Sequence, residues 1–252
     1  MKKALIGGSL TLALLLAGCG GDDAGDAGAT NAATNGTTAA PPVLEQVEAP
    51  NGDWSAVVTK TPEGWYRMGN PNAPVKLVEY GSLTCPACRA FSENGAGPLT
   101  QNYVKSGQVS WEFRHLLIHG APDVALAMLA ECQPPAAFFR TIEQIYASQS
   151  DLLDNIEPQE EQQLAAAAPD QQLGLIARAM ELDSFFGQRG MPSARFQQCI
   201  GDLNAAQALA ERSNAAGMED EVRGTPTFFI NGEHVDATTW QALEPELRDA
   251  IG

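Results

Sequence analysis

The residues from Val75 to Cys88 read VKLVEYGSLTCPAC and combine a strand-like run with a closely spaced pair of cysteines. The apolar, β-prone run ends at Tyr80, and Cys85 and Cys88 then form a Cys-x-x-Cys motif. Pro86 fits the first turn of a following helix, where its missing N–H costs nothing. We therefore expect the Cys85 sulfur at a helix N-terminus, where the helix dipole and free N–H groups stabilise a thiolate, the form that attacks disulfides.

The same spacing of two cysteines occurs in zinc sites, so the motif alone leaves two chemistries open. Zinc usually takes four ligands, and the sequence has no second Cys-x-x-Cys. His115 and His119 come nearest, but they lie in a β-prone run and not on an evident helix. The strand, turn and helix around the cysteines favour redox chemistry, so we predict no metal site and no cofactor. His115, His119 and His234 are expected to be surface or scaffold residues.

A second stretch, RGTPTFFING from Arg223 to Gly232, supports the redox interpretation. Pro226 opens a run with the composition of a central strand, where proline is unusual because it cannot donate to the ladder. A cis bond between Thr225 and Pro226 is one explanation, and such bonds are usually kept for a purpose. Asn231 and the glycine after it then predict a type I′ turn in a hairpin.

Together these stretches resemble the thioredoxin-like superfamily, and more closely the Dsb-type thiol–disulfide oxidoreductases of the bacterial envelope. The resemblance covers about residues 65–252. It rests on the dithiol motif, on Glu79 six residues before Cys85, and on the Gly-Thr-Pro-Thr run that starts at Gly224. One departure is Ala87, because the strong oxidants of the family have histidine there. We therefore expect a reduction potential between those of thioredoxin and the strongest oxidants.

The resemblance implies a role for each matching residue. Cys85 forms a mixed disulfide with a substrate protein, and Cys88 resolves it. Cys85 is therefore predicted to be the more exposed thiol, with the lower pKa. Glu79 would relay a proton to or from Cys88 if it is buried, and would otherwise be an exposed strand residue. Thr225 and Pro226 would face the dithiol and hold substrate backbone by strand-like hydrogen bonds.

The predicted fold is α/β, a thioredoxin-like fold with a large helical insertion at about residues 121–217. A strand–helix–strand order at its start suggests a parallel pair of strands. Trp54 to Val58 is interpreted as a short strand or a packed tail, and Trp65 to Gly69 as an edge strand. The other expected strands are 75–80, 108–118, 227–230 and 233–235. The expected helices follow the motif and occupy 122–132, 138–146, 164–168, 173–180, 193–200, 203–216 and 238–250.

The N-terminal region has the pattern of a secretion signal. Residues 1–18 begin with two lysines and continue as an apolar run that is too short for a stable membrane span. The run leads to Leu-Ala-Gly-Cys at Cys19, which resembles a bacterial lipoprotein signal with a lipidated cysteine; a chance cysteine after an ordinary signal is the alternative. Residues 19–50 would be the lipidated N-terminus and a flexible linker, and 51–252 the domain. We therefore expect a lipid-anchored protein of the cell envelope that faces the periplasm.

Two further cysteines, Cys132 and Cys199, lie in the helical region. Unpaired thiols would be a liability in an oxidising compartment, so a structural disulfide between them is the preferred hypothesis. Relatives of the Dsb type sometimes carry an extra disulfide in this region. Two separate buried thiols are the alternative.

The formal net charge of −16 argues against nucleic acid as a partner, because its binders need basic patches. The expected partners are protein substrates with thiols or disulfides, a redox partner protein and, through the lipid, a membrane. No heptad repeat predicts a coiled coil, and we expect a monomer.

Three functions remain open at this point. The first is a thiol–disulfide oxidoreductase that exchanges disulfides with envelope proteins. The second, in the same class, is an isomerase or reductase that needs a reducing partner. The third is a module that binds a metal or a peptide through Cys85 and Cys88 without catalysis. The sequence does not choose between net oxidation, isomerisation and reduction.

Overall fold

A mixed six-stranded β-sheet forms the centre of the fold in the computed structural model, which describes residues 43–252. The strand order is β1-β2-β4-β3-β5-β6. The β3 and β4 strands are parallel, as predicted, and the other neighbouring pairs are antiparallel. The strands are β1 (Val58–Lys60), β2 (Tyr66–Gly69), β3 (Val75–Gly81), β4 (Val109–His115), β5 (Thr227–Ile230) and β6 (Glu233–Val235). The predicted signal peptide and Cys19 lie outside the described residues.

Near the N-terminal edge of the sheet, the strand predicted at Trp65 to Gly69 is present but does not lie at the edge, and of the two alternatives for Trp54 to Val58 the strand is not formed. Trp54 to Ala56 forms a short 3-10 turn, and the strand that follows begins only at Val58. That strand pairs with β2, which therefore lies between β1 and β4 and is not an edge strand. The predicted strand 108–118 is also shorter, because β4 ends at His115 and the next residues lead into a helix.

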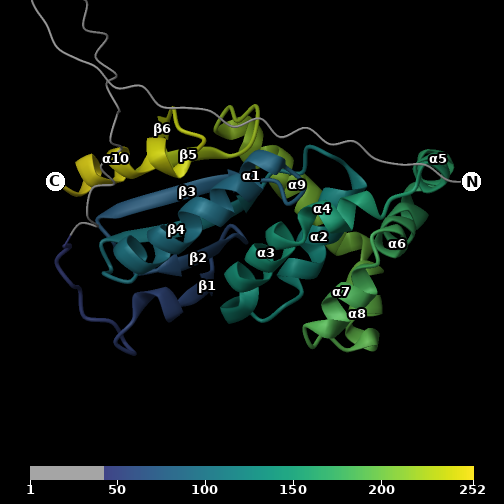
Figure 1. The fold of residues 1–252 in the computed structure, drawn as a ribbon, viewed down its shortest axis with the longest axis horizontal. Coiled ribbons are helices and arrows are strands. Elements are labelled where there is room, and N and C mark those ends of the chain that lie inside the picture. The colour runs from purple at the N-terminus through teal and green to yellow at the C-terminus, as the bar shows by residue number, and fades with distance from the viewer. Residues whose placement is uncertain (1–42) are drawn as a thin grey trace, which may run out of the picture. The chain divides into compact units, whose positions relative to one another are not determined.

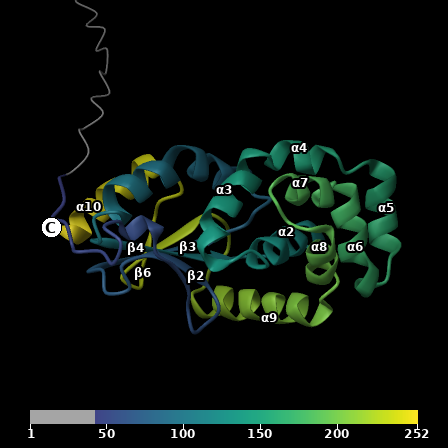
Figure 2. The same ribbon diagram turned by 90° about the horizontal axis from the view of Figure 1, so that it is seen from below.

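Helices fill most of the chain between β4 and β5. They are α2 (Ala121–Glu131), α3 (Phe138–Ala147), α4 (Gln149–Asp154), α5 (Pro158–Ala166), α6 (Pro169–Ala179), α7 (Leu182–Gln188), α8 (Ser193–Ile200) and α9 (Leu203–Glu219). Figures 1 and 2 show α2 to α8 gathered at one end of the sheet, with the long α9 returning from them. The α7 helix was not among the predicted helices, and residues 151–163, for which no helix was predicted, are largely helical.

The helix after the cysteine motif is longer than one regular α-helix. The α1 helix (Pro86–Phe91) continues through a π-helical segment at Ser92–Ala96 and a second one at Leu99–Val104. The wider π-helical turns lie on either side of Gly97 and Pro98, and both residues keep helical backbone angles.

A hairpin and a final helix close the fold. Asn231 and Gly232 join β5 to β6 with φ values of 53° and 89°, the left-handed angles that a type I′ turn requires. The Asn231 side chain also accepts a hydrogen bond from the backbone N–H of Lys76 at 2.9 Å. The α10 helix (Trp240–Ile251) begins after Thr239, whose hydroxyl caps it, and continues through Pro245 to its end.

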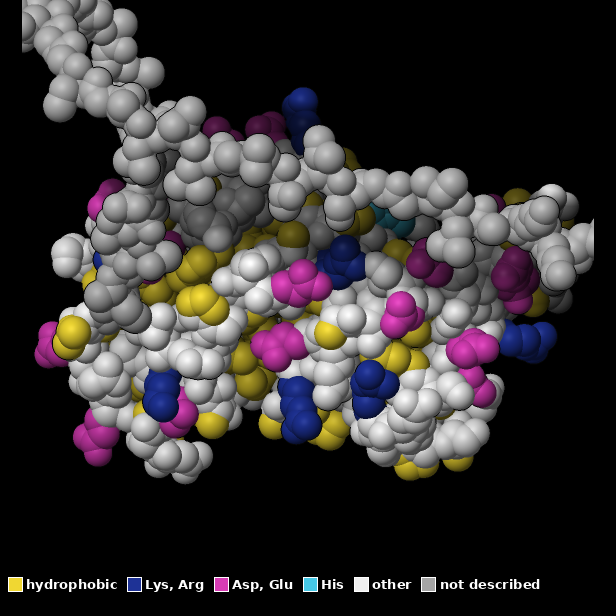
Figure 3. Space-filling model, viewed as in Figure 1, with side chains coloured by type: hydrophobic (Ala, Val, Ile, Leu, Met, Phe, Trp, Pro, Cys, Tyr) yellow, Lys and Arg dark blue, Asp and Glu magenta, His cyan; other side chains and the backbone are white. Residues whose placement is uncertain are grey.

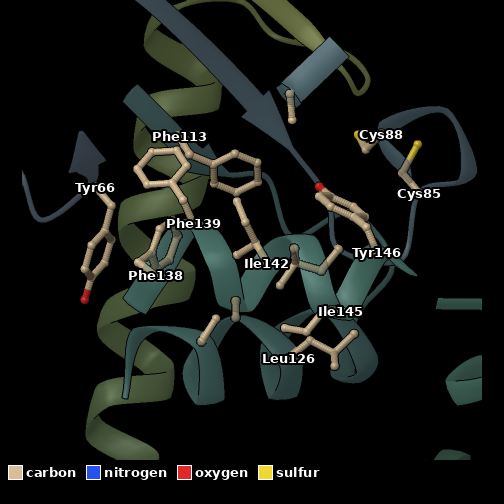
Figure 4. Close-up of a cluster of buried hydrophobic side chains, with 14 of the residues drawn as sticks. Tyr66, Cys85, Cys88, Phe113, Leu126, Phe138, Phe139, Ile142, Ile145 and Tyr146 are labelled. Carbon is tan, nitrogen blue, oxygen red and sulfur yellow. The ribbon is translucent and has the colours of Figure 1, made fainter. Parts of the chain in front are cut away.

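The two faces of β3 belong to different clusters of apolar residues. Leu77 belongs to the large core, to which α1 and α10 also contribute side chains. The same core includes Phe113, Phe138 and Ile142 (Figure 4). Tyr80 points to the opposite face, where it packs in a small cluster beside α9. The two cysteines follow the end of β3, which has an apolar cluster on each face. The residues around the two sulfurs are therefore mostly buried.

Candidate redox site

The two cysteines of the motif occupy the first turn of α1. Cys85 is the N-cap residue, with extended backbone angles, and Pro86 is the first helical residue. Cys85 keeps 9% of its surface exposed, whereas Cys88, one turn inside the helix, has none. Both are free thiols in this structure. Cys85 therefore keeps more exposed surface than Cys88, as the motif predicts, and Figure 4 shows the two side chains close together.

The surroundings shift the pKa values of the two thiols in opposite directions. Hydrogen bonding from the Cys88 thiol, opposed by burial and helped by Thr225 and by the backbone N–H groups of Ala87 and Cys88, lowers the pKa of Cys85 to about 5. Burial, the hydrogen bond to Cys85 and the nearby Glu79 carboxyl raise the pKa of Cys88 well above its usual range. At neutral pH the reduced site therefore holds a thiolate at Cys85 and a thiol at Cys88.

The loop before β5 lies beside Cys85. The bond between Thr225 and Pro226 is cis, and the Cys85 Sγ lies 3.3 Å from the Thr225 carbonyl oxygen, to which Cys85 donates a hydrogen bond only in its protonated form. The hydroxyl oxygen of Thr225 is buried and has no partner of regular hydrogen-bond geometry among residues 43–252. It nevertheless lies near enough to both sulfurs to lower the pKa of each. Pairing of Thr227 with Tyr80 holds this loop next to the end of β3.

Glu79 is buried under the dithiol, with 1% of its surface exposed. Its carboxyl accepts a hydrogen bond of 3.0 Å from the indole N–H of Trp111 on β4. Burial, only partly offset by this hydrogen bond, raises the pKa of Glu79 to about 8. The condition for a proton-transfer role, burial near Cys88, is therefore met, and the exposed alternative is not.

Residues of the helical insertion also reach the motif, and no pattern in the sequence predicts them. Asp123, Tyr146 and Gln149 all make hydrogen bonds to the turn between Ser82 and Cys85. They lie 41, 64 and 64 residues from their respective partners along the chain. A buried aspartate, tyrosine and glutamine in amphipathic helices carry no local signature, so only the tertiary fold brings them to the site.

The three histidines have different surroundings. His115 is fully buried among aromatic rings, and burial lowers its pKa to about 3, so the ring is neutral. His119 is exposed, and its Nδ1 lies 2.8 Å from the hydroxyl of Thr84, just before the motif. His234 lies on β6 with its ring edge-on to Phe229. Within residues 43–252, no three His, Cys, Asp or Glu side chains form a group that could hold a metal ion.

Cys132 and Cys199 are joined by a disulfide, with Cα atoms 6.2 Å apart. Cys132 is the C-cap residue of α2, and Cys199 lies in α8. The bond links two helices of the insertion across 67 residues of sequence. This position, apart from Cys85 and Cys88, suits a structural role.

A mixed sheet with a Cys-x-x-Cys at the start of a helix and a cis-proline loop beside it defines a protein of the thioredoxin-like class. The family model described as "Thioredoxin" matches residues 60–249, and the chain belongs to this family. The match includes the motif, the helical insertion and the final helix.

Similar sequences occur among proteins with names from disulfide chemistry. A protein of Rickettsia bellii named "Putative protein-disulfide oxidoreductase" is 24% identical over 213 residues, or 84% of this chain and 74% of that protein. A protein of Rickettsia prowazekii with the same description is 25% identical over 193 residues, or 73% of this chain. That second alignment spans 63% of the relative's own length.

Solved structures agree with this assignment. The crystal structure of protein-disulfide isomerase from Novosphingobium aromaticivorans has a TM-score of 0.70 and 27% identity, and the match covers 74% of this chain and 96% of that one. Alpha-DsbA1 of Wolbachia pipientis has a TM-score of 0.60 and 20% identity, covering 74% and 90% of the two chains. The second similarity shows the fold alone.

Proposed function

We propose that this chain is a protein thiol–disulfide oxidoreductase and that Cys85 and Cys88 are its redox pair. The observation that carries the proposal is the contrast between the two thiols at the start of α1. Cys85 is partly exposed with a pKa of about 5, and Cys88 is buried with a raised pKa. A thiolate that keeps some accessible surface is suited to attack, and a fully shielded thiol is suited to resolve the intermediate.

In the oxidising direction the pair starts as a disulfide. A substrate thiolate attacks the Cys85 sulfur, the bond between Cys85 and Cys88 breaks, and Cys88 leaves with the electron pair and takes up a proton. A second substrate thiolate then attacks the substrate sulfur of the mixed disulfide and releases Cys85 as a thiolate. The substrate loses two electrons and the redox pair gains them. Because Cys85 is stabilised as a thiolate, it is a good leaving group.

Glu79 supports the exchange of a proton with Cys88. With a pKa of about 8 the carboxyl is mostly protonated at neutral pH, so it can give up a proton to the Cys88 thiolate and take it back when Cys88 attacks. The loop at Thr225 and Pro226 would hold the backbone of the substrate beside the sulfurs, in the manner of an added strand.

The partners and location proposed for this chain are those expected of a thiol–disulfide oxidoreductase of the cell envelope. Its substrates would be proteins with thiols or disulfides, and a separate redox protein would restore the pair. Lipid on Cys19, after removal of residues 1–18, would hold the domain at a membrane of the cell envelope, facing the periplasm. Within residues 43–252, no helix is both long and apolar enough to cross a bilayer.

Isomerase activity is a second candidate. The supporting observation is the similarity to the Novosphingobium protein, which is described as a protein-disulfide isomerase and is 27% identical. The same two thiols would serve both directions, and the redox state supplied by the partner would decide between them.

Trapping of the mixed disulfide tests the proposal. In a Cys88→Ser variant the resolving thiol is absent, so a disulfide-bonded complex between Cys85 and a thiol-containing protein should accumulate under mild oxidation. Cys85→Ser is the matched control and should form none. Equal trapping by both variants, or none by either, would show that the pair does not exchange disulfides as proposed.

A further inference from the structure

The turn that delivers Cys85 to the start of α1 is held by side chains from the helical insertion. Asp123 from α2, Tyr146 from α3 and Gln149 from α4 each bind it, and all three side chains are buried. The turn is otherwise a short connection between β3 and α1, with few backbone partners of its own. Its conformation therefore depends on a part of the chain outside the thioredoxin-like sheet.

Asp123 is the centre of this arrangement, and its side chain is completely buried. Its Oδ1 accepts hydrogen bonds from the Ser82 hydroxyl at 2.9 Å, the Thr84 hydroxyl at 3.0 Å and the Thr84 backbone N–H at 3.2 Å. Its Oδ2 accepts from the backbone N–H of His119 at 3.0 Å. A carboxylate with this many donors around it is satisfied only while the turn keeps its present shape.

Gln149 holds the other side of the turn. Its side-chain amide donates to the carbonyl oxygens of Leu83, at 2.9 Å, and Cys85, at 3.1 Å. The Cys85 carbonyl also accepts the first helical hydrogen bond, from Arg89 at 3.1 Å. Gln149 therefore binds the peptide group at which α1 begins.

Tyr146 completes the set from α3. Its hydroxyl donates to the Ser82 carbonyl oxygen at 3.2 Å, and Figure 4 shows its ring beside Cys85 and Cys88. A Cβ added to Gly81 would lie 3.2 Å from this hydroxyl and 2.6 Å from the ring of Phe113. The close approach explains why glycine stands where β3 enters the turn.

We infer that Asp123 and Gln149 are positioning residues of the redox site, which hold the Cys85 sulfur within reach of Cys88 and of the loop at Thr225. The inference rests on the proposed redox function of the pair. It assigns the helical insertion a direct part in setting the reactivity of Cys85, since the turn fixes where the Cys85 sulfur lies relative to Cys88 and to Thr225, the groups that lower its pKa. A rotation of the turn would weaken the hydrogen bond from Cys88 without removing either thiol.

Two substitutions separate this role from simple loss of stability. Gln149→Leu leaves the Leu83 and Cys85 carbonyls without their side-chain donor at similar side-chain size. Asp123→Asn replaces one acceptor oxygen by an amide that faces existing donors, and Asp123→Glu keeps the carboxylate as the conservative variant. Ser82→Ala removes a single donor from Asp123 and serves if the stronger changes prevent folding.

The control variant is Ser106→Ala. Ser106 is also buried, and its hydroxyl bonds the Tyr103 carbonyl and the Gln108 N–H just before β4. Because β3 and β4 are parallel, this position is at the opposite end of the sheet from the motif. Its loss should lower the melting temperature and leave Cys85 unchanged.

The readout is the pH dependence of Cys85 alkylation in the reduced protein, with thermal unfolding measured in parallel. We expect Gln149→Leu and Asp123→Asn to move the alkylation midpoint upward by about one pH unit, a tenfold loss of thiolate below the midpoint. Asp123→Glu should recover most of the wild-type value. Variants that are folded and less stable but titrate like wild type would overturn the inference. No substrate is involved, so this result is independent of whether the protein catalyses disulfide exchange.

Discussion

Cys85 and Cys88 are three positions apart in the sequence, and the fold gives them nearly opposite chemistry. Cys85 is the N-cap residue of α1, and hydrogen bonding from the Cys88 thiol is the largest cause of its lowered pKa. Cys88 faces the interior near Glu79, where a negative charge is costly. The positions of the two sulfurs in one helical turn therefore determine which of them is the thiolate at neutral pH.

Alkylation of the reduced protein should show this contrast directly. Because the pKa of Cys85 is about 5, its modification rate should rise as the pH increases through about 5 and reach a plateau near neutral pH. Cys88 should stay unmodified over the same range. Mass spectrometry after brief iodoacetamide treatment measures both sites, and preferential modification of Cys88 would reverse the assignment.

Glu79 should make the stability of the protein depend on pH. Its pKa is raised from 4.5 to about 8, so the folded state binds the proton more tightly than the unfolded state. The resulting stability is complete below pH 4.5 and is lost as the pH rises to about 8. Glu79→Gln removes this loss and should raise the free energy of unfolding by about 3 kcal/mol at pH 7 and by almost nothing at pH 4.

Urea unfolding at several pH values measures this effect. Glu93→Gln is the control, because the Glu93 side chain is 54% exposed and its loss should change stability little at any pH. The Glu79 variant should also exchange disulfides more slowly, since an amide cannot relay the proton. An equal shift in stability at pH 4 and pH 7 would show that ionisation of Glu79 is not the cause.

At the scale of secondary structure, the elements with strong local patterns agree best with prediction. The strands β5 and β6 and the helix α8 have the predicted limits, because a proline, an Asn-Gly turn and an apolar period mark them. The α7 helix (Leu182–Gln188) was missed because it is short and starts after Glu181, which has a left-handed φ of 51°. β2 was taken for an edge strand because no sequence pattern shows that the three-residue β1 pairs with it.

The disulfide between α2 and α8 should stabilise the insertion. It closes a loop across 67 residues, which in the chain-entropy model corresponds to roughly 4 kcal/mol of free energy of unfolding. Replacing both Cys132 and Cys199 by serine should therefore lower the melting temperature. Disulfide exchange by Cys85 should remain, and loss of exchange in a folded double variant would mean that the bond takes part in the reaction.

For the whole molecule, the sequence predicted the centre of the site more fully than its surroundings. Glu79, the two cysteines and the Thr-Pro pair all lie in the motif strand or in the loop paired with it. Gln149 and Asp123 come from helices whose packing against the motif has no signature in the sequence.

Charged side chains of both signs are interspersed on the face shown in Figure 3, in line with a soluble surface.

The predicted anchor is tested at the same scale. Cys19→Ser removes the proposed lipid attachment and should move the protein from the membrane fraction to the soluble fraction of the cells. The isolated domain should keep its disulfide exchange activity, because the site lies within residues 43–252. Unchanged partitioning of the Cys19 variant would rule out lipid at this cysteine as the anchor.

The central claim is that Cys85 and Cys88 form a reversible redox pair, and an equilibrium titration in glutathione buffers tests it most directly. We predict a single two-electron transition between about −270 mV, the value for thioredoxin, and about −120 mV, the value for the strong Dsb oxidant. The lowered pKa of Cys85 favours the reduced form, while Ala87 adds no positive charge or donor. Ala87→His should therefore raise the potential. The absence of a reversible transition, or a wild-type value at either limit, would contradict the account.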